Sequence, residues 1–430
     1  MMFKTIYKLG QKLRNPSIDN IFSSLKKSET WSLEELEKYQ LNKLKELLEF
    51  SNTNSKFYKN LWAKNNIDVS KISTLNDFLK LPVVTKTDLL NNVDSITSTE
   101  KFEKLFKVST SGSSGESLEF FREEHSDSFN RASIFRGYSW FQVFPWERNG
   151  YFWGFSFSPI KKIKTQILDS LQNRFRLFSY EINDMNSFLK KLEKANYLHG
   201  YSSMIYHVAR TINEKKVKPS FKLKMIKGTS EKIFEHYQQE VMKAFGSRII
   251  SEYGSAETGI IAFECPHGKM HLNMEGVIVE EVDDEIVVTN LQLKNFPIIR
   301  YKLGDYIKLA DKNTTCNCGM KHLILEEVTG RVGQNIFGKK GVYPSLYLYY
   351  IFKNLSKEKN ILLNYQVVQN TKGVLEFRIS ENLNNDQLAL LKLEIKKYFS
   401  EDMDNYILDN YDFKERKKEK IKNFISKINE

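Results

Sequence analysis

Helical patterns and short apolar strands follow one another along most of this 430-residue chain, and that arrangement constrains its fold more than any other feature. Leu and aromatic residues at three-to-four spacing predict a helix over 30–60, and similar patterns predict helices over 185–195, 202–214 and 231–245. Apolar β-branched runs predict strands, which are VIVEEV (277–282), EIVVTNL (285–291), PIIRY (297–301) and YIKLA (306–310). We therefore expect a large α/β domain over residues 1–331, with a strand-rich part over about 248–330.

The pattern changes after residue 331. A short strand (NIF) is followed by a helix (PSLYLYYIFKNL), two strands (LLNYQVVQN and VLEFRIS) around the turn TKG, and a second helix (NDQLALLKLEIKKYF). This predicts a small α+β unit, and its length of about 100 residues suits a separate domain. The expected second domain therefore spans residues 332–430.

The charge balance is basic but dispersed. Lys+Arg exceed Asp+Glu by 65 − 53 = 12, yet the lysines alternate with glutamates, except in KERKKEKIK near the C-terminus. This distribution is typical of solvated helix faces, so we expect no nucleic-acid partner. The basic N-terminus, MMFKTIYKLGQKLRN, is interpreted as a helix packed on the protein or, alternatively, as a weak contact with an anionic membrane.

Two further features bear on the cellular compartment. No run approaches the ~20 apolar residues of a transmembrane helix, so we expect no membrane span. Three cysteines cannot build a disulfide framework, which favours the reducing cytoplasm.

Several catalytic signatures are missing from the chain. It has no GxxxxGK[ST], no GxGxxG after a strand, no GxSxG and no HExxH. These absences disfavour P-loop kinases, standard dinucleotide dehydrogenases, α/β-hydrolases and zincin proteases.

Three other segments carry candidate chemistry. In Val108–Ser117, glycines and hydroxyl residues alternate, which lets backbone N–H groups and hydroxyls converge on phosphate oxygens. In Ser251–Gly259, an aromatic residue, two glycines and an acid form a tight loop in which Glu257 could bind Mg²⁺ and Tyr253 could flank a purine. In Pro297–Asp305, a carboxylate after glycine could accept both hydroxyls of a ribose. Each segment alone could equally be an ordinary turn.

Taken together, the motifs resemble the ANL adenylate-forming superfamily, and within it the phenylacetate–CoA ligase-like branch that includes capsule-biosynthesis relatives. The resemblance spans roughly residues 40–425. Its motifs are TSGSSGE (110–116), GYSS (200–203), GTSEKIFEHY (228–237), EYGSAET (252–258), FPIIRYKLGD (296–305), Gly330-Arg331 and GVYPSLYLYYIF (341–352).

The resemblance implies a two-step ligase. ATP and a small-molecule carboxylate would form an acyl-adenylate and pyrophosphate, and an acceptor, most often the CoA thiol, would then displace AMP. Mg²⁺ would assist the first step. The residues implied to hold the phosphates are Thr110, Ser111, Gly112, Ser113, Ser114 and Gly115. The EYGSAET motif would supply Tyr253 to adenine, with Gly254 and Ser255 beside it, and Glu257 to Mg²⁺. Asp305 would hold the ribose, Arg331 would contact the ribose or set the hinge, and Lys420 would be the mobile catalytic lysine.

The chain departs from the family pattern at two positions. Glu116 follows the last glycine of the phosphate loop, where the family has a basic residue, and Gly333 lies where a hinge acid is common. The second departure bears on the transfer step, so two alternatives to CoA transfer stay open. The acyl group could pass to an amine or a sugar hydroxyl, or the chain could be a non-catalytic binding protein on the same fold. The oligomeric state is not indicated.

All three cysteines lie in the strand-rich part. Cys265 opens the segment CPHGKMH, and Cys316-Asn-Cys318-Gly has the shape of a metal knuckle. With one histidine they would complete a tetrahedral structural Zn²⁺ site. The candidate histidines are His267, His271 and His322, and the spacing found in the resembled family favours His271.

An aromatic-rich stretch over about 135–160 admits two interpretations. It could line an apolar pocket for the acid, or it could be part of the core.

Overall fold

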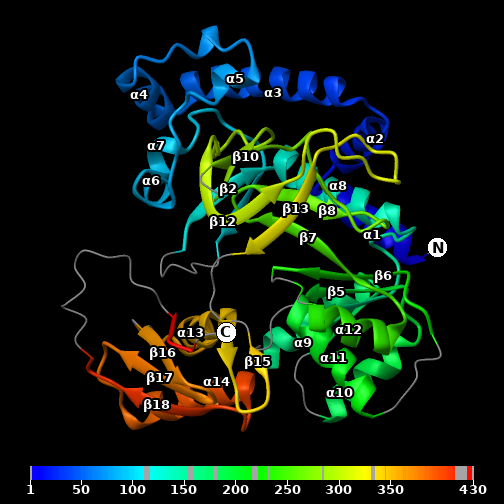
Figure 1. Cartoon of the computed structure of the whole chain (residues 1–430), viewed down its shortest axis with the longest axis vertical. Coiled ribbons are helices and arrows are strands. Elements are labelled where there is room, and N and C mark those ends of the chain that lie inside the picture. The colour runs from blue at the N-terminus through cyan, green and yellow to red at the C-terminus, as the bar shows by residue number, and fades with distance from the viewer. Residues whose placement is uncertain are drawn as a thin grey trace. The chain divides into compact units, whose positions relative to one another are not determined.

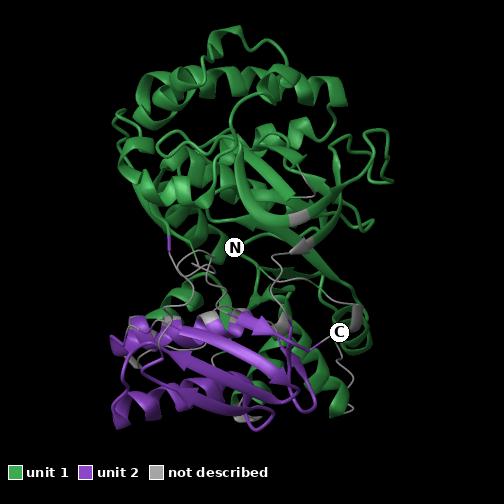
Figure 2. Ribbon diagram, turned by 60° about the vertical axis from the view of Figure 1, so that its left-hand side comes forward, with its two compact units in different colours: residues 1–110, 118–155, 163–331 green, residues 111–117, 156–162, 332–430 purple. Residues whose placement is uncertain are grey.

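The computed structural model describes residues 2–110, 117–152, 159–177, 182–215, 221–230, 233, 235–282, 285–330, 335–343, 345–361, 363, 365–411 and 424–428. The chain forms two compact units (Figure 2). Unit 1 comprises Met1–Thr110, Leu118–Phe155 and Ile163–Arg331, and unit 2 comprises Ser111–Ser117, Ser156–Lys162 and Val332–Glu430.

Unit 1 is built around an eleven-stranded mixed sheet in the order β10-β11-β12-β13-β9-β8-β7-β6-β5-β3-β4 (Figure 1). The strands are β3 (Asn149–Phe152), β4 (Arg174–Arg176), β5 (Tyr197–Tyr201), β6 (Met225–Thr229), β7 (Ile249–Ser255), β8 (Gly259–Glu264), β9 (Met270–Leu272), β10 (Val277–Val282), β11 (Glu285–Asn290), β12 (Tyr301–Leu309) and β13 (Ile324–Gly330). A separate hairpin pairs β1 (Leu105–Ser109) with β2 (Glu119–Glu123).

The helices up to the first strand of the large sheet are α1 (Met2–Arg14), α2 (Ile18–Ser28), α3 (Leu33–Asn54), α4 (Lys56–Lys64), α5 (Leu75–Phe78), α6 (Lys86–Asn91), α7 (Val93–Ile96) and α8 (Glu124–Trp140), with a 3₁₀ turn at Val69–Lys71. Those that follow are α9 (Pro159–Leu171), α10 (Ile182–Leu192), α11 (Ser202–Glu214) and α12 (Glu235–Phe245).

One half of the sheet is parallel. Strands β4, β3, β5, β6 and β7 all pair in parallel, and α10, α11 and α12 connect successive strands, as parallel pairing requires. Both faces are covered, because Tyr138 of α8 packs against Tyr197 and Met225 on one face, while Leu198 faces the side of α10 on the other. The carboxyl ends of these strands therefore meet at one edge of the sheet.

The other half is antiparallel and begins at β7, which pairs with β6 on one side and with β8 on the other. Its core includes the leucines of α3, of which Leu36, Leu44 and Leu48 are fully buried. Helix α3 starts at a capping box in which the Ser32 hydroxyl and the Glu35 carboxylate each accept a backbone N–H of the other residue. A strong start signal and a leucine stripe together explain why this helix forms.

Two predicted elements differ from the structure. The helical pattern predicted over 30–60 is confirmed, but it forms two helices, because Ser55 is extended and separates α3 from α4; the preceding run of Asn, Thr and Asn is poor in helix formers. The strand predicted over 297–301 is wrong, because only Tyr301 belongs to β12. Arg300 has a left-handed φ of 47°, and its guanidinium is bonded to Glu280 and to the Leu79 carbonyl.

Unit 2 is a small α+β fold. A four-stranded sheet in the order β18-β17-β16-β19 is accompanied by the two-stranded pair β14-β15. Its elements are β14 (Ile336–Phe337), β15 (Val342–Tyr343), α13 (Leu346–Lys359), β16 (Tyr365–Thr371), β17 (Val374–Ile379), α14 (Asn385–Phe399), β18 (Asp404–Leu408) and β19 (Phe424–Ser426). The α/β class expected for the chain, with a large sheet and a small C-terminal sheet, is confirmed.

None of the helices within the described ranges has both the length and the apolar character that crossing a membrane requires.

Candidate functional site

The turn between β7 and β8 presents Glu257. A Cβ added to Gly254 would lie 2.4 Å from the Gly259 carbonyl oxygen, so only glycine allows the chain to close here. The Ser255 hydroxyl accepts a hydrogen bond from the Thr258 N–H at 3.1 Å and also meets the Thr258 hydroxyl at 2.9 Å. These contacts make a short, internally bonded turn that carries one buried carboxylate.

Side chains from other strands hold this turn from outside. Arg122 of β2 donates from Nη2 to the Ala256 carbonyl at 2.6 Å, and Asn290 of β11 donates to the Thr258 carbonyl at 3.0 Å. Both side chains are buried. Glu257 is thus positioned by groups on either side of it in the turn.

Lys86, in the first turn of α6, joins two of the predicted motifs. Its Nζ donates to Oε1 of Glu257 at 2.9 Å and to the hydroxyl of Thr110 at 3.1 Å. The ion pair is largely sheltered, because the side chains of Lys86 and Glu257 are 16% and 4% exposed. A buried carboxylate needs such a partner, since an unpaired charge would be strongly unfavourable there.

Thr110 is the one residue among those implied to hold the phosphates that the structure describes. Its N–H donates to the Leu118 carbonyl and its hydroxyl accepts from the Leu118 N–H, each at 2.9 Å. These bonds fix the two ends of the loop beside each other. The remaining loop positions, Ser111, Gly112, Ser113, Ser114, Gly115 and Glu116, lie outside the described residues.

Tyr253 and Asp305 are also brought together. The Tyr253 hydroxyl donates to Oδ2 of Asp305 at 2.7 Å, although one residue lies on β7 and the other on β12. The bond places an aromatic ring and a carboxylate side by side, and we call this the Tyr253–Asp305 group. Arg331, Gly333 and Lys420 lie outside the described residues, so their predicted roles stay predictions.

Lys86 is the site residue that the sequence analysis missed. The chain contains 65 Lys and Arg residues, so a single lysine carries no signal by itself. The available clue is the capping box of Thr85 and Asp88, which fixes the start of α6 and places Lys86 at its first position. That signal predicts a helix start but does not predict the partners of the lysine.

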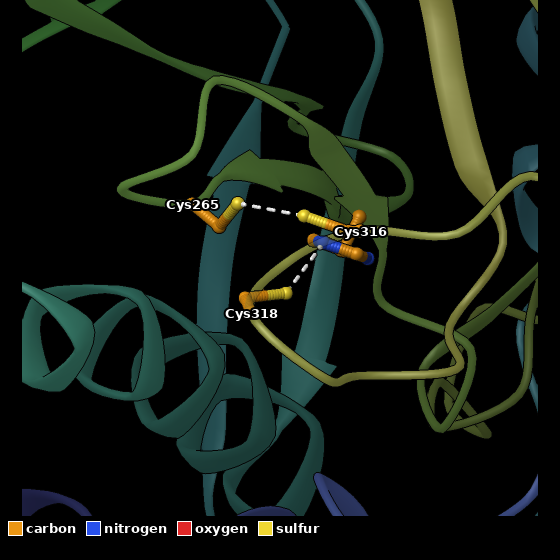
Figure 3. Close-up of side chains that lie close together, drawn as sticks. Cys265, Cys316 and Cys318 are labelled. Atoms are coloured by element: carbon orange, nitrogen blue, oxygen red, sulfur yellow. Dashed lines mark hydrogen bonds between the residues drawn. The ribbon is translucent and has the colours of Figure 1, made fainter.

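The three cysteines and His271 lie close together beside β8 and β9 (Figure 3). One ligand atom from each of Cys265, His271, Cys316 and Cys318 lies within 4.8 Å of the other three. The Cys265 and Cys316 sulfurs are 3.6 Å apart, and the Cys318 sulfur is 3.2 Å from Nε2 of His271. Tetrahedral Zn²⁺ with bonds of about 2.0–2.3 Å requires ligand separations of this size. The set is therefore suited to Zn²⁺.

The orientation of His271 suits the same role. Its Nδ1 lies 3.2 Å from the His322 carbonyl oxygen, which can only accept, so the proton is on Nδ1 and the Nε2 lone pair points toward Cys318. Burial lowers the pKa of His271 to about 4, so the ring is neutral near pH 7. Burial and the neighbouring thiols raise the pKa of Cys318 to about 12, and a bound divalent cation would reverse that effect.

The other candidate histidines are engaged elsewhere or exposed. Nε2 of His322 lies 2.9 Å from a carboxylate oxygen of Glu275, which also accepts from Arg136 at 2.7 Å and from the hydroxyl of Ser28. Burial opposes the charge on Glu275, but Arg136 and His322 hold its pKa well below the ordinary value. This network packs α2 and α8 against the segment that carries the cysteines. His267 is exposed.

The aromatic stretch near 135–160 contributes to the core over its described residues. Tyr138 and Val143 are buried with Phe263, and Trp140 packs edge-on against the same phenylalanine. These contacts leave those side chains inside the protein, which favours the core interpretation for them, whereas Phe144 of the same stretch is 42% exposed.

The fold and the sequence of the chain were each compared with those of known proteins. No family model matches the chain. Its fold is shared with 2-hydroxyisobutyryl-CoA ligase in complex with 2-HIB-AMP and CoA, in the thioesterification state. The two structures superpose with a TM-score of 0.63 at 16% sequence identity, and the match covers 93% of this chain and 91% of the ligase. An open conformation of the same ligase gives a TM-score of 0.59 over 89% and 90% of the two chains, again at 16% identity.

The amino-acid sequence is also similar to that of a known protein. Protein CapK of Staphylococcus aureus is 26% identical over 375 residues, which cover 84% of this chain and 82% of CapK. Together with the shared fold, this similarity confirms the resemblance to the ANL adenylate-forming superfamily.

The metal cluster gives the first prediction. We expect His271→Ala to lose about one bound zinc per chain. The midpoint of thermal unfolding should fall by about 5–10 °C, because the variant lacks a ligand that connects β9 to the segment with Cys316 and Cys318. His267→Ala is the matched control, since it removes a histidine of the same segment whose side chain is exposed. Elemental analysis and calorimetry of protein purified without chelator measure both effects. Equal zinc content in the two variants would contradict the assignment.

The Lys86–Glu257 pair gives the second prediction. Lys86→Met leaves a buried carboxylate unpaired, so we expect a loss of about 1–3 kcal/mol in the free energy of unfolding. Adding Glu257→Gln to Lys86→Met should recover much of this loss, because no unpaired charge remains. Urea unfolding monitored by circular dichroism measures both changes.

The matched control is Lys80→Met, because the side chain of Lys80 is 77% exposed. A stability loss that is the same in the single and double variants would argue against a charge-pairing role.

Proposed function

We propose that the protein activates a small-molecule carboxylic acid with ATP and passes the acyl group to an acceptor, with the CoA thiol as the expected acceptor. The observation that carries this proposal is the contact of Lys86 with both Glu257 and Thr110. A cation, a carboxylate and the entrance of a hydroxyl-rich loop meet there at the turn of the EYGSAET motif. This combination suits the binding of a polyphosphate.

In the first step, a carboxylate oxygen of the acid attacks the α-phosphorus of ATP, and the bond from that phosphorus to the pyrophosphate oxygen breaks. No covalent enzyme intermediate is needed, so catalysis consists of positioning and charge stabilisation. Thr110 and the loop residues 111–115 would donate to phosphate oxygens, and Lys86 would offset their negative charge. The Tyr253–Asp305 group would hold the nucleoside, with the ring against adenine and the carboxylate accepting ribose hydroxyls.

The residues also fit the cation that accompanies ATP. Mg²⁺ in nucleotide sites is commonly held by one or two carboxylates together with phosphate oxygens, and Glu257 offers one carboxylate at the required place. When bound, the ion would offset charge on the phosphates. The Cys/His cluster has four protein ligands and no open position, so Zn²⁺ there would stabilise the fold and take no part in the reaction.

In the second step, the acceptor attacks the acyl carbonyl and AMP leaves. The CoA complex of the 2-hydroxyisobutyryl-CoA ligase whose fold this chain shares supports a thiol acceptor. The sequence GRVGQN supports the runner-up, an amine or sugar hydroxyl acceptor, because Gly333 replaces the acid that is common at the hinge.

Pyrophosphate release with a panel of carboxylates, measured with and without CoA, tests the function. We expect release with at least one acid, and thioester formation when CoA is added. Asp305→Ala should raise the KM for ATP about tenfold or more, because charge-assisted hydrogen bonds to the ribose are lost, while the KM for the acid changes little. Asp311→Ala, at an exposed site, is the control.

Adenylate formation with transfer only to an amine or hydroxyl would replace CoA by the runner-up. The absence of pyrophosphate release with every acid would support a non-catalytic binding protein.

The lysine near the C-terminus gives a separate prediction. We expect Lys420→Ala to slow adenylate formation about a hundredfold, the scale of losing one donor to the transition state. Transfer from a pre-formed acyl-adenylate should be much less affected, because the family performs that step with the small domain turned. Lys422→Ala, in the same basic run, is the matched control. Equal slowing of both half-reactions by Lys420→Ala would contradict the assignment.

A further inference from the structure

Helix α1 exposes a stripe of large apolar side chains. Met2, Leu9 and Leu13 are 64%, 59% and 80% exposed, which is unusual for three such residues in one short helix. Their spacing of seven and four residues places them on one face of the helix. The stripe is thus continuous along the length of α1.

The opposite face of α1 is already packed on unit 1. The ring of Tyr7 contacts Phe135 and Trp146, and the buried Gln11 donates to Asp19 at 2.8 Å. Asn15, directly after the helix, donates to Asp127 of α8 at 2.9 Å. The orientation of α1 is therefore fixed by its inner face, and the apolar stripe faces away from the protein.

Positive charge predominates on the same helix. The ammonium groups of Lys4 and Lys8 lie toward the packed face, each 5.4 Å from the centroid of the Trp146 ring, and Lys12 is exposed. Helix α1 contains Lys4, Lys8, Lys12 and Arg14 and no acidic residue. The Lys104 ammonium donates to the Leu13 carbonyl and adds another cation at the C-terminal end of the stripe. Two of the helix cations have acidic partners, because Lys8 pairs with Asp19 and Arg14 lies 3.7 Å from Asp127. Because the four cations of α1 outnumber these two acidic partners, the helix surface keeps a net positive charge.

This combination selects the occupant. A second copy of the chain would bring two basic helices together, and an RNA would leave the leucines in water. An anionic bilayer matches both features, because its acyl region accepts Leu9 and Leu13 while its headgroups attract the flanking lysines. Helices that lie in the plane of a membrane have this character: a basic polar side beside a narrow apolar face.

We propose that α1 is a membrane-surface contact that holds the protein reversibly on an anionic lipid bilayer. The contact is peripheral, since only the outer face of one helix of thirteen residues takes part. It is independent of the ligase site proposed above, and no residue of that site belongs to it.

Co-sedimentation of the full chain with vesicles tests the proposal. We expect binding to vesicles of equal parts phosphatidylglycerol and phosphatidylcholine, weaker binding at high salt, and no binding to phosphatidylcholine alone. The double variant Leu9→Gln/Leu13→Gln should weaken binding by about tenfold or more. Glutamine is used because its helix propensity is close to that of leucine. Lys12→Glu should weaken binding by a few-fold through its charge.

Two control variants separate this contact from general stickiness. Leu393→Gln removes a leucine that is 54% exposed on α14, and Lys38→Glu reverses an exposed charge on α3. Both should bind vesicles like the parent, and circular dichroism should be unchanged in all variants. No binding of the parent to anionic vesicles would overturn the proposal. So would equal losses in the control variants, a dimer that the double variant abolishes, or RNA binding that the double variant leaves intact.

Discussion

The hydrogen bond between Tyr253 and Asp305 constrains the curvature of the large sheet. Three strands, β8, β9 and β13, separate β7 from β12 within the sheet. In a flat sheet the two strands would lie four spacings apart, on the order of 19 Å, which is beyond the combined reach of the two side chains. The bond of 2.7 Å therefore requires the antiparallel half to curl back on itself. The same curl lets Asn290 on β11 reach the turn that carries Glu257.

Much of the fold could be predicted because local patterns carry it. The helix over 202–214 and the strand over 277–282 have the predicted bounds, since each has a clear periodicity and ends at polar or turn residues. The strand predicted at 297–301 failed because Ile298 and Ile299 are both buried without alternation, and Arg300 turns the chain to reach Glu280. Apolar runs identify burial better than they identify strand pairing.

The site could be predicted only in part, for a related reason. The loops around Tyr253, Glu257 and Asp305 stand out because glycine, aromatic and acidic residues occur together in short segments. Lys86 does not, because its partner is 171 positions away and nothing near it in sequence indicates a buried carboxylate. The cysteine cluster was accessible because thiols are rare in this chain and metal ligands have characteristic spacings. The surrounding network of Glu275, Arg136 and His322 had no comparable signal.

Strand β7 has a consequence for the order in which parts of the large unit form. It is shared by a parallel half, which needs crossover helices, and an antiparallel half, which is built from sequential strands. Each half can bury apolar surface before the other is complete, but the Glu257 turn is held by Arg122 of β2, Lys86 of α6 and Asn290 of β11, which are far apart in the sequence. Such non-local contacts form late, because long loops must close first. Newly synthesised chains would thus contain most of their secondary structure before the Glu257 turn is complete.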